Sequence, residues 1–294
     1  MLGFMGIGYF MRKKHIGGDG VSTVLSALVV NIFMPSLCIK TFSENFTVSG
    51  ISQNADFLLA GTVTIICEFL IAKPLSRLFA KNEFQRNVYL YSFLIPNLGY
   101  MGYPLMEAVF GTEMLFKMMV FVIPFNLVIY TYGIYILNPK HEMSLKGVLN
   151  PSIIAMFIGM VIGLTGIKLP VFVTGIVDSA RACMSPAAMI MTGFVLASVP
   201  LKPVLLNGTA YLAALVRGIL IPAIAFAALY FLKVENGILI VAVATLAMPL
   251  GLNSIVFPEA YGGDSVTGAK ICIVSNIISV ITIPLVFAVL GNFM

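Results

Sequence analysis

The sequence predicts an all-α integral membrane protein with about ten transmembrane helices in two inverted five-helix repeats. Three observations support this fold class. The chain is 60% hydrophobic and 10% charged, against about 25% charged residues in ordinary soluble domains, and its mean hydropathy is +1.03. Its long apolar runs suit helices that cross a bilayer and exclude the short alternating strands of a membrane barrel. Two of these runs, 85–111 and 237–263, are interrupted by proline and glycine.

The expected spans follow from the apolar runs and the polar segments between them. They are residues 1–11, 20–42, 56–79, 86–110, 115–137, 150–167, 170–197, 205–232, 237–262 and 266–291. The first has roughly half of the ~20 residues that a span needs, so either it tilts into a thin region or the natural gene encodes residues before it. A signal peptide is not expected, because the basic cluster follows this apolar segment instead of preceding it.

Lysine and arginine alternate between the connections, which predicts the topology. Short loops rich in these residues stay cytoplasmic. The connections at 12–14 and 73–86 are basic, the one at 43–56 contains acids and no base, and the one at 138–149 is again basic. We therefore expect both termini on the outside. The net charge of +5 is mostly this topology signal, so membrane lipid is an expected partner and nucleic acid is not.

The fourth and ninth spans are expected to be broken helices. Pro96 and Pro104 interrupt the fourth, and Pro249 and Pro258 interrupt the ninth. Every backbone N–H and C=O in hydrocarbon needs a partner, so an unwound segment persists only where it is buried in protein or lines a polar cavity. Paired broken helices in the two halves of a chain point to the binding site of a secondary transporter.

A shift of about 151 residues aligns the sequences of the two halves of the chain. The matching landmarks are Gly8 with Gly159, Pro35 with Pro186, Gly111 with Gly262 and, with a small length difference, Pro124 with Pro284. This predicts repeats at 1–137 and 150–294, joined by a short cytoplasmic connection at 138–149. Because five spans is an odd number, the second repeat enters the membrane from the opposite side, which gives an inverted repeat.

The fourth span carries a resemblance to a known family. PNLGYMGYPLMEAVFG resembles the crossover-helix motif of the auxin efflux carrier family, which includes the plant PIN carriers and many bacterial permeases. The matching residues are Pro96, Asn97, Met101, Gly102, Pro104, Leu105, Ala108 and Gly111. MPLGLNSIVFPEAYG is similar to the second crossover helix, and GYFMRKKHI, VNIFMPSL and LNPSIIAMFIG resemble the first, second and sixth spans.

The resemblance implies a secondary active transporter of organic anions with a scaffold domain and a transport domain, the latter containing two crossing helices. Two departures from the family pattern matter. The long central loop of the plant carriers is reduced to 138–149, which favours a permease in the cytoplasmic (inner) membrane of a prokaryote. The proline expected at the second crossing is replaced near Asn253 and Ser254, which leaves the substrate open.

The chemistry of a broken helix agrees with an anionic substrate. Its exposed N–H groups carry partial positive charge and attract a carboxylate, while its freed carbonyls attract a cation. Asn97 offers two donors and an acceptor. The candidate substrate-binding residues are Asn97, Gly99, Met101, Gly102, Pro104, Gly251, Asn253 and Ser254. In the alternative interpretation Asn97 and Asn253 only cap or bridge helices.

Arg217 is the charged residue nearest to the centre of a predicted span. It is expected to hold a structural ion pair with Glu68 or Asp178, and the alternative is that it attracts an anion. Glu68 lies near Lys73 at the cytoplasmic end of its span, where a long side chain can reach water.

Other charged residues in the spans suggest different roles. Asp178 and Arg181 are three residues apart on one helix and are expected to pair with each other, with a coupling role for Asp178 in a proton relay as the alternative. Glu107 and Glu259, each just past a crossing, are the better candidates for sensing a proton or another cation.

Enzymatic function is not expected. The sequence shows no set of catalytic residues, no metal-ligand spacing and no Walker motif. No cofactor is therefore predicted. Transport would use a proton or sodium gradient or simple facilitation. Two alternatives remain open: a sodium-coupled organic anion symporter of the bile-acid type, and a membrane ligand sensor without transport. A homodimer is also left open.

Overall fold

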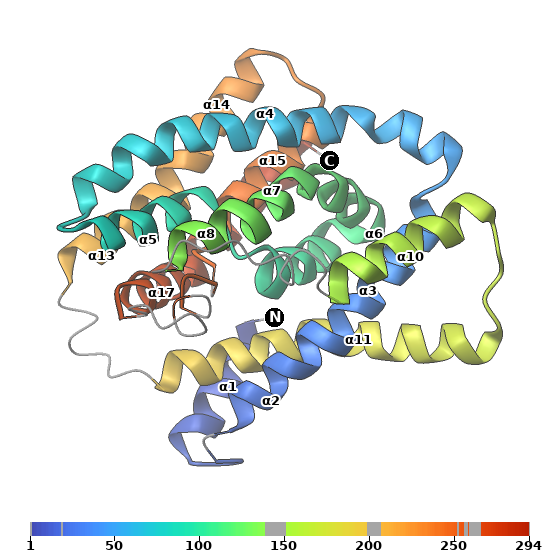
Figure 1. The fold of residues 1–294 in the computed structure, drawn as a ribbon, viewed down its shortest axis with the longest axis horizontal. Helices are drawn as coiled ribbons and strands as arrows, with labels where there is room; N and C mark the ends of the chain where they lie inside the picture. The colour runs from blue at the N-terminus through green and yellow to red at the C-terminus, as the bar shows by residue number, and fades with distance from the viewer. Residues whose placement is uncertain are drawn as a thin grey trace. The chain divides into compact units, whose positions relative to one another are not determined.

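The structure, a computed structural model, describes residues 2–18, 20–138, 151–198, 207–251, 253–255, 258 and 266–293. Within these ranges it contains helices and one isolated β-bridge but no strand (Figure 1). Contacts divide the chain into two compact units. Unit 1 comprises 1–55, 99–117 and 149–200, and unit 2 comprises 56–98, 118–148 and 201–294. Each unit therefore draws on both predicted repeats.

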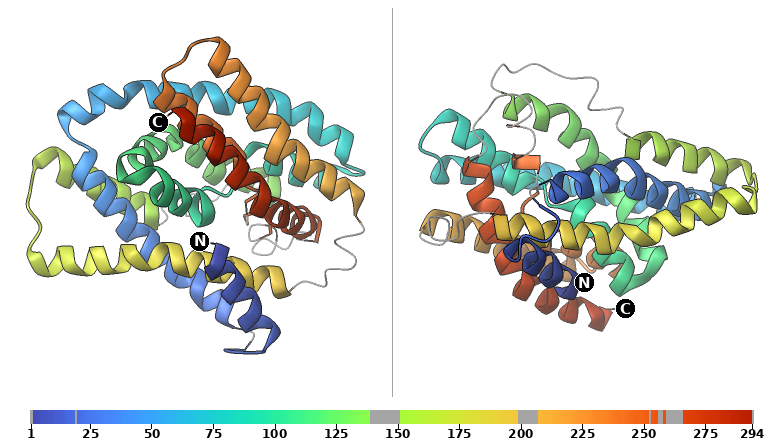
Figure 2. Two further views of the ribbon diagram at one scale, coloured as in Figure 1. Left: turned by 180° about the vertical axis from the view of Figure 1, so that it is seen from behind. Right: turned by 90° about the horizontal axis from the view of Figure 1, so that it is seen from below.

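Unit 1 combines the N-terminal helices with two helices from the second half of the chain. Its elements are α1 (Leu2–Lys13), α2 (Val21–Leu28), the π-helical turn η1 (Val29–Phe33), α3 (Met34–Asn45), most of the π-helical turn η2 (Leu98–Gly102), most of α6 (Tyr103–Phe121), α10 (Pro151–Thr165) and α11 (Val171–Ser198). Helices α1 to α3 all pack on α11, and α10 packs on α3. In Figure 2 the blue N-terminal helices run across the yellow α11.

Two glycines bring the helices of unit 1 into backbone contact. A Cβ atom at Gly8 of α1 would lie 2.1 Å from the carbonyl oxygen of Ile190 in α11. A Cβ atom at Gly159 of α10 would lie 3.0 Å from the carbonyl oxygen of Ile39 in α3. Small residues at such positions allow helices in membranes to approach closely. The two contacts are related by the predicted shift, because 151 residues separate Gly8 from Gly159 and Ile39 from Ile190.

The close α1–α11 contact gives a stability prediction. Gly8→Ala should destabilise the protein by about 1 to 3 kcal/mol, because the new methyl group meets backbone that cannot rotate away. Thermal unfolding of the purified protein in detergent, followed by circular dichroism, measures the effect. Gly6 is the matched control, since it lies in the same helix and a Cβ atom there would have no other atom within 4 Å. Equal melting temperatures for Gly6→Ala and Gly8→Ala would contradict the contact.

Unit 2 contains the remaining helices. They are α4 (Val48–Phe79, from Asp56 onward), α5 (Glu83–Leu94), α7 (Ile123–Val128), η3 (Ile129–Gly133), α8 (Ile134–Leu137), α13 (Gly208–Leu215), η4 (Val216–Leu220), α14 (Ile221–Phe231), α15 (Asn236–Ala247), α17 (Val266–Leu290) and η5 (Gly291–Phe293). Here α17 packs on α5, α13, α15 and η4, and α15 also packs on α14. Helix α15 has no exposed face after its first turn, since every residue from Ile238 to Ala247 is buried.

Prolines follow most of the π-helical turns, which are wider than α-helical turns and occur in both units. Of the four π-helical turns in the described part of the chain, three end two residues before a proline: η1 before Pro35, η2 before Pro104 and η4 before Pro222. A proline ring clashes with the carbonyl four residues earlier and cannot donate to it, and each of those carbonyls lies in the wide turn. Turns of this kind occur frequently at functional sites, and two of them hold predicted site residues, Met101 in η2 and Arg217 in η4.

Among the described residues, each expected span contains at least one helix. Four helices among the described residues are long and apolar enough to cross a bilayer, Val21–Asn45, Asn54–Phe79, Gly208–Phe231 and Thr267–Phe293, and a fifth span is formed if the pair Leu98–Phe121 and Ile123–Leu137, bent by 47°, is counted as one. Pro151–Thr165 and Asn236–Ala247 are shorter apolar helices. The inverted ten-helix arrangement stays a prediction.

Two helices extend beyond the predicted ends of their spans. Helix α4 begins at Val48, inside the segment predicted as a connection, and continues through Pro74 to Phe79. Helix α6 runs past the predicted end of the fourth span, but Gly111 within it has a φ of 84° and a ψ of 177°. Only glycine adopts this conformation readily, so the chain is kinked at the predicted boundary.

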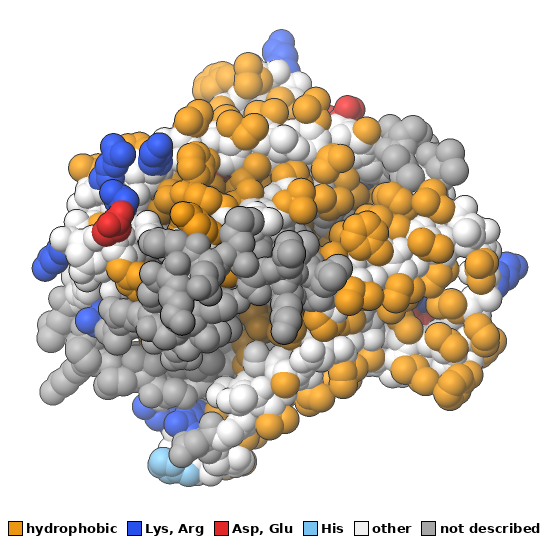
Figure 3. All heavy atoms as spheres, viewed as in Figure 1, with side chains coloured by type: hydrophobic (Ala, Val, Ile, Leu, Met, Phe, Trp, Pro, Cys, Tyr) orange, Lys and Arg blue, Asp and Glu red, His pale blue; other side chains and the backbone are white. Residues whose placement is uncertain are grey.

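The described surface is rich in hydrophobic side chains. On the face shown in Figure 3, hydrophobic side chains spread over much of the described surface and charged ones are few. Val171, Leu78 and Phe231 are among the most exposed large hydrophobic residues. A water-soluble protein rarely exposes extended apolar surface of this kind, whereas acyl chains cover it in a bilayer.

Candidate functional site

Both predicted helix breaks are present, and each begins at the residue before a proline. Helix α5 ends at Leu94, and Ile95 is extended with a φ of −117° and a ψ of 112°. Helix α15 ends at Ala247, and Met248 has a φ of −64° and a ψ of 143°. A following proline disfavours the helical conformation of the preceding residue. The dipeptides Ile95-Pro96 and Met248-Pro249 therefore stop the two helices by the same local mechanism.

The two extended segments pair with each other within unit 2. Pro96 and Leu250 form an antiparallel β-bridge, and the backbone N–H of Asn97 donates to the carbonyl oxygen of Pro249 over 2.8 Å. In a continuous helix this N–H would donate to the carbonyl of Phe93, four residues earlier. Each break thus supplies a backbone partner that the other needs, which satisfies the requirement for paired groups inside a membrane protein.

Arg217 donates a hydrogen bond to the Phe93 carbonyl, which the first break leaves without its helical partner. Its Nη1 atom donates to the Phe93 oxygen over 2.9 Å and to Glu68 Oε1 over 2.5 Å. The side chains of Arg217 and Glu68 are 0% and 4% exposed. A cation at the C-terminal end of a helix is favoured by the helix dipole, so Arg217 caps the half-helix α5.

Glu68 is one of the two ion-pair partners predicted for Arg217. The prediction that Glu68 reaches water beside Lys73 was wrong, because its carboxylate is buried against Arg217. The contact with Arg217 offsets part of the cost of burying the charge.

Side chains of helix α17 form hydrogen bonds with the backbone of the second break. The N–H of Leu250 donates to Ser275 Oγ over 3.1 Å, and Cys272 Sγ donates to the Leu250 carbonyl over 3.4 Å. Asn276 donates from Nδ2 to the Cys272 carbonyl over 2.7 Å. Sequence reasoning missed these residues. The signal was available, because Cys272, Ser275, Asn276 and Ser279 share one face of an otherwise apolar helix.

Several polar atoms around the paired breaks have no hydrogen-bond partner among the described residues. Asn97 is 3% exposed, and its Nδ2 atom is buried without an acceptor. Asn276 Oδ1 and Thr245 Oγ1 are also buried without partners. Leaving such groups unpaired costs roughly 1 to 3 kcal/mol each. A polar ligand that reached these atoms would therefore gain hydrogen bonds that the protein does not make by itself.

Of the other predicted residues of the ninth span, Gly251 and Ser254 contact the second break. Gly251 is buried, and a Cβ atom there would lie 3.5 Å from the Pro96 carbonyl oxygen. Ser254 donates from Oγ to the Gly251 carbonyl over 2.9 Å, so its hydroxyl proton is used within its own turn. Asn253 is half-buried and Pro258 is buried.

The second half of the fourth span belongs to the other unit. Leu98 is the last residue grouped with unit 2, and Gly99, Met101, Gly102 and Pro104 are grouped with unit 1. Within unit 1, a Cβ atom at Gly99 would lie 2.5 Å from the flexible end of Met34. The break at Pro96 therefore coincides with the boundary between the units.

The predicted ion pair between Asp178 and Arg181 was wrong. Asp178 contacts Lys40 of α3 over 2.9 Å, and Arg181 contacts Glu107 of α6 over 2.5 Å. Neighbours three apart on a helix interact weakly, and here each charge finds a closer partner on another helix. Glu107, a predicted coupling candidate, is thus engaged with Arg181. Glu259, the other candidate, lies outside the described residues.

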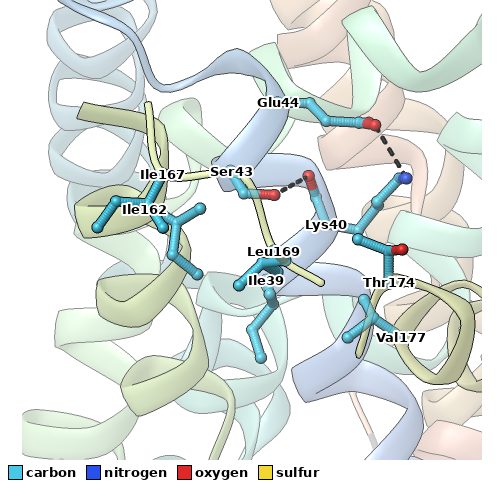
Figure 4. Close-up of a pocket in the computed structure, with 9 residues that line it drawn as sticks. All are labelled: Ile39, Lys40, Ser43, Glu44, Ile162, Ile167, Leu169, Thr174 and Val177. Atoms are coloured by element: carbon cyan, nitrogen blue, oxygen red, sulfur yellow. Dashed lines mark hydrogen bonds and ion pairs between the residues drawn. The ribbon is translucent and has the colours of Figure 1, made fainter. Parts of the chain in front are cut away.

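Unit 1 also contains a small cavity of about 140 Å³. It lies between α3 and the segment joining α10 to α11, as shown in Figure 4. Lys40 is the only cation among the described residues that line it, and the ammonium group contacts both Glu44, over 3.0 Å, and Asp178. Two carboxylates already surround this charge, so the cavity offers little attraction to an anion.

Comparison with known proteins identifies relatives. A family model described as "Membrane transport protein" matches residues 2–146 and 141–287. The chain is also 25% identical to the uncharacterized transporter MJ1031 of Methanocaldococcus jannaschii over 297 residues, covering 95% of this chain and 93% of the relative.

Proposed function

Because this chain belongs to the membrane transport protein family, the auxin efflux carrier family that its fourth span resembles, we propose that it is a secondary active transporter of small organic anions. It moves them across the cytoplasmic membrane by alternating access, with both termini outside. Family membership establishes a membrane transporter and not an enzyme. The substrate class and the mechanism are the proposal.

The observation that carries the proposal is the unpartnered amide of Asn97 beside the paired breaks. Its backbone N–H is held by Pro249, so the side chain starts from a fixed position, and its buried Nδ2 atom has no acceptor among the described residues. A carboxylate is an acceptor-only group and suits an unpartnered donor. A ligand held among fixed backbone groups loses little binding energy to reorganisation.

The charged groups at the break do not oppose an anion. Arg217 stands at the end of the half-helix that precedes Asn97, and its pair with the Glu68 carboxylate is neutral overall. The Nε and Nη2 atoms of Arg217 have no partner among the described residues, so donors remain that suit an arriving carboxylate.

Two features support the inverted repeat on which alternating access depends in this proposal. The glycine contacts of Gly8 with Ile190 and of Gly159 with Ile39 are related by one sequence shift. Unit 1 groups the first two helical segments of each predicted repeat, and unit 2 groups most of the remainder. We assign unit 1 as the scaffold and unit 2, which holds the paired breaks, as the transport domain.

The test is transport by the purified protein in liposomes. Vesicles loaded with a panel of labelled mono- and dicarboxylates are exchanged against the same unlabelled anions, and net uptake is then measured under imposed pH or sodium gradients. We expect exchange of at least one carboxylate and none in protein-free vesicles. Exchange of cations or neutral solutes in place of all the carboxylates would overturn the proposal.

A further inference from the structure

The ion pair of Glu68 and Arg217 is incompletely satisfied. An arginine that serves a structural pair commonly meets a carboxylate with two parallel hydrogen bonds. Here a single nitrogen, Nη1, contacts a single oxygen, Oε1. Glu68 Oε2, Arg217 Nε and Arg217 Nη2 are all buried without partners among the described residues. Charged groups inside a membrane span are costly, and they usually mark a pathway for ions or protons.

The free atoms of Arg217 form one edge of its guanidinium group. Nε and Nη2 point in the same direction and together make the fork that binds a carboxylate bidentately. The opposite nitrogen, Nη1, holds Glu68 and the Phe93 carbonyl. Arg217 is therefore built to contact a second carboxylate without releasing the end of α5.

We propose that Glu68 carries the coupling proton of this transporter, and that Arg217 passes its counter-ion role from Glu68 to the carboxylate of the transported anion. This inference rests on the proposed function. A proton from the aqueous phase adds to one oxygen of the Glu68 carboxylate, and no other covalent bond changes. The positive charge of Arg217 is then neutralised by the substrate carboxylate at Nε and Nη2. Proton and anion enter together, so the buried site stays neutral.

The break in the fourth span links this exchange to the substrate site. Arg217 Nη1 holds the carbonyl of Phe93, and the N–H that this carbonyl would bind in a helix belongs to Asn97. A change in the position of the guanidinium group therefore acts on the end of α5, three residues before Asn97. Two carboxylates beside one arginine repel each other, and protonation of Glu68 removes this repulsion.

Other ionisable groups near this part of α4 do not replace Arg217. Among the described residues Glu68 forms an ion pair with Arg217 alone. The ring of Tyr132 in η3 packs on Phe69 with centroids 5.7 Å apart, and Arg86 of α5 pairs with Glu83 over 3.0 Å. On α4 itself the basic residues are Lys73 and Arg77, toward its C-terminal end.

The transport test separates coupling from exchange. Glu68→Gln keeps the shape of the side chain and cannot release a proton, so it should retain exchange of the labelled carboxylate and lose accumulation driven by a pH gradient. Glu83→Gln removes an exposed, arginine-paired carboxylate and is the matched control. Accumulation by Glu68→Gln equal to that of the parent protein would overturn the proposal. Exchange by the parent protein without any effect of a pH gradient would also overturn it and would leave the proposed function standing.

A second measurement needs no substrate. Infrared difference spectra of the purified protein between acidic and alkaline pH should show the carbonyl stretch of a protonated carboxylic acid. This band should persist in Glu83→Gln, disappear in Glu68→Gln and shift in Glu68→Asp, which keeps an acid if the amide variant fails to fold. Absence of a band assignable to Glu68 would overturn the proposal even if no carboxylate of the panel is transported.

Discussion

Arg217→Met should destabilise the protein by about 3 to 5 kcal/mol, the cost of removing one partner of a buried ion pair. The substitution leaves the Glu68 carboxylate buried without a cation and the Phe93 carbonyl without a donor. Denaturant or thermal unfolding in detergent, followed by circular dichroism, measures the loss. The double variant Glu68→Leu with Arg217→Met should recover much of it, because no unpaired charge then remains.

Arg86→Met is the control for this prediction. Arg86 also pairs with a glutamate, but its side chain is 41% exposed and that of Glu83 is 79% exposed. An exposed ion pair contributes about 0 to 1 kcal/mol, so this variant should unfold close to the parent protein. Similar losses for Arg86→Met and Arg217→Met would show that Arg217 does not support the break.

Asn97→Ala should weaken binding of the transported anion by roughly ten- to a hundredfold, because a hydrogen bond to a charged group contributes about 1.5 to 3 kcal/mol. Asn97→Asp should bind more weakly still, since it places a negative charge beside the substrate carboxylate. Both variants should reach the membrane, because the backbone N–H that contacts Pro249 is kept. Titration of the purified variants with the carboxylate identified by the exchange assay gives the affinities.

Asn31→Ala is the control for side-chain amide loss. Asn31 lies in η1 of unit 1, and its Nδ2 atom donates to the carbonyl of Ala27 in its own helix over 2.8 Å. Binding should be unchanged. If Asn97→Ala binds the anion as tightly as the parent protein, Asn97 is a structural bridge, and the free edge of Arg217 becomes the first place to seek the carboxylate.

The sequence alone predicted the features that depend on neighbouring residues. Proline restricts the residue before it, so the breaks after Leu94 and Ala247 could be placed from Pro96 and Pro249. Hydropathy located the helices, because a long apolar run has few other solutions in a bilayer. The family could be recognised from the fourth span for the same reason, since its prolines, glycines and asparagine act mainly on their own segment.

Only the tertiary structure decided which groups meet. The N–H of Asn97 and the carbonyl of Pro249 are far apart in sequence, and so are Arg217 and Phe93, yet each pair is within hydrogen-bond distance. Asp178 pairs with Lys40 and not with Arg181, its neighbour on the helix. A buried charge or backbone group binds the nearest suitable partner in space, because an unpaired one is costly there. That distance is set by how the helices pack, and no local pattern in the chain records it.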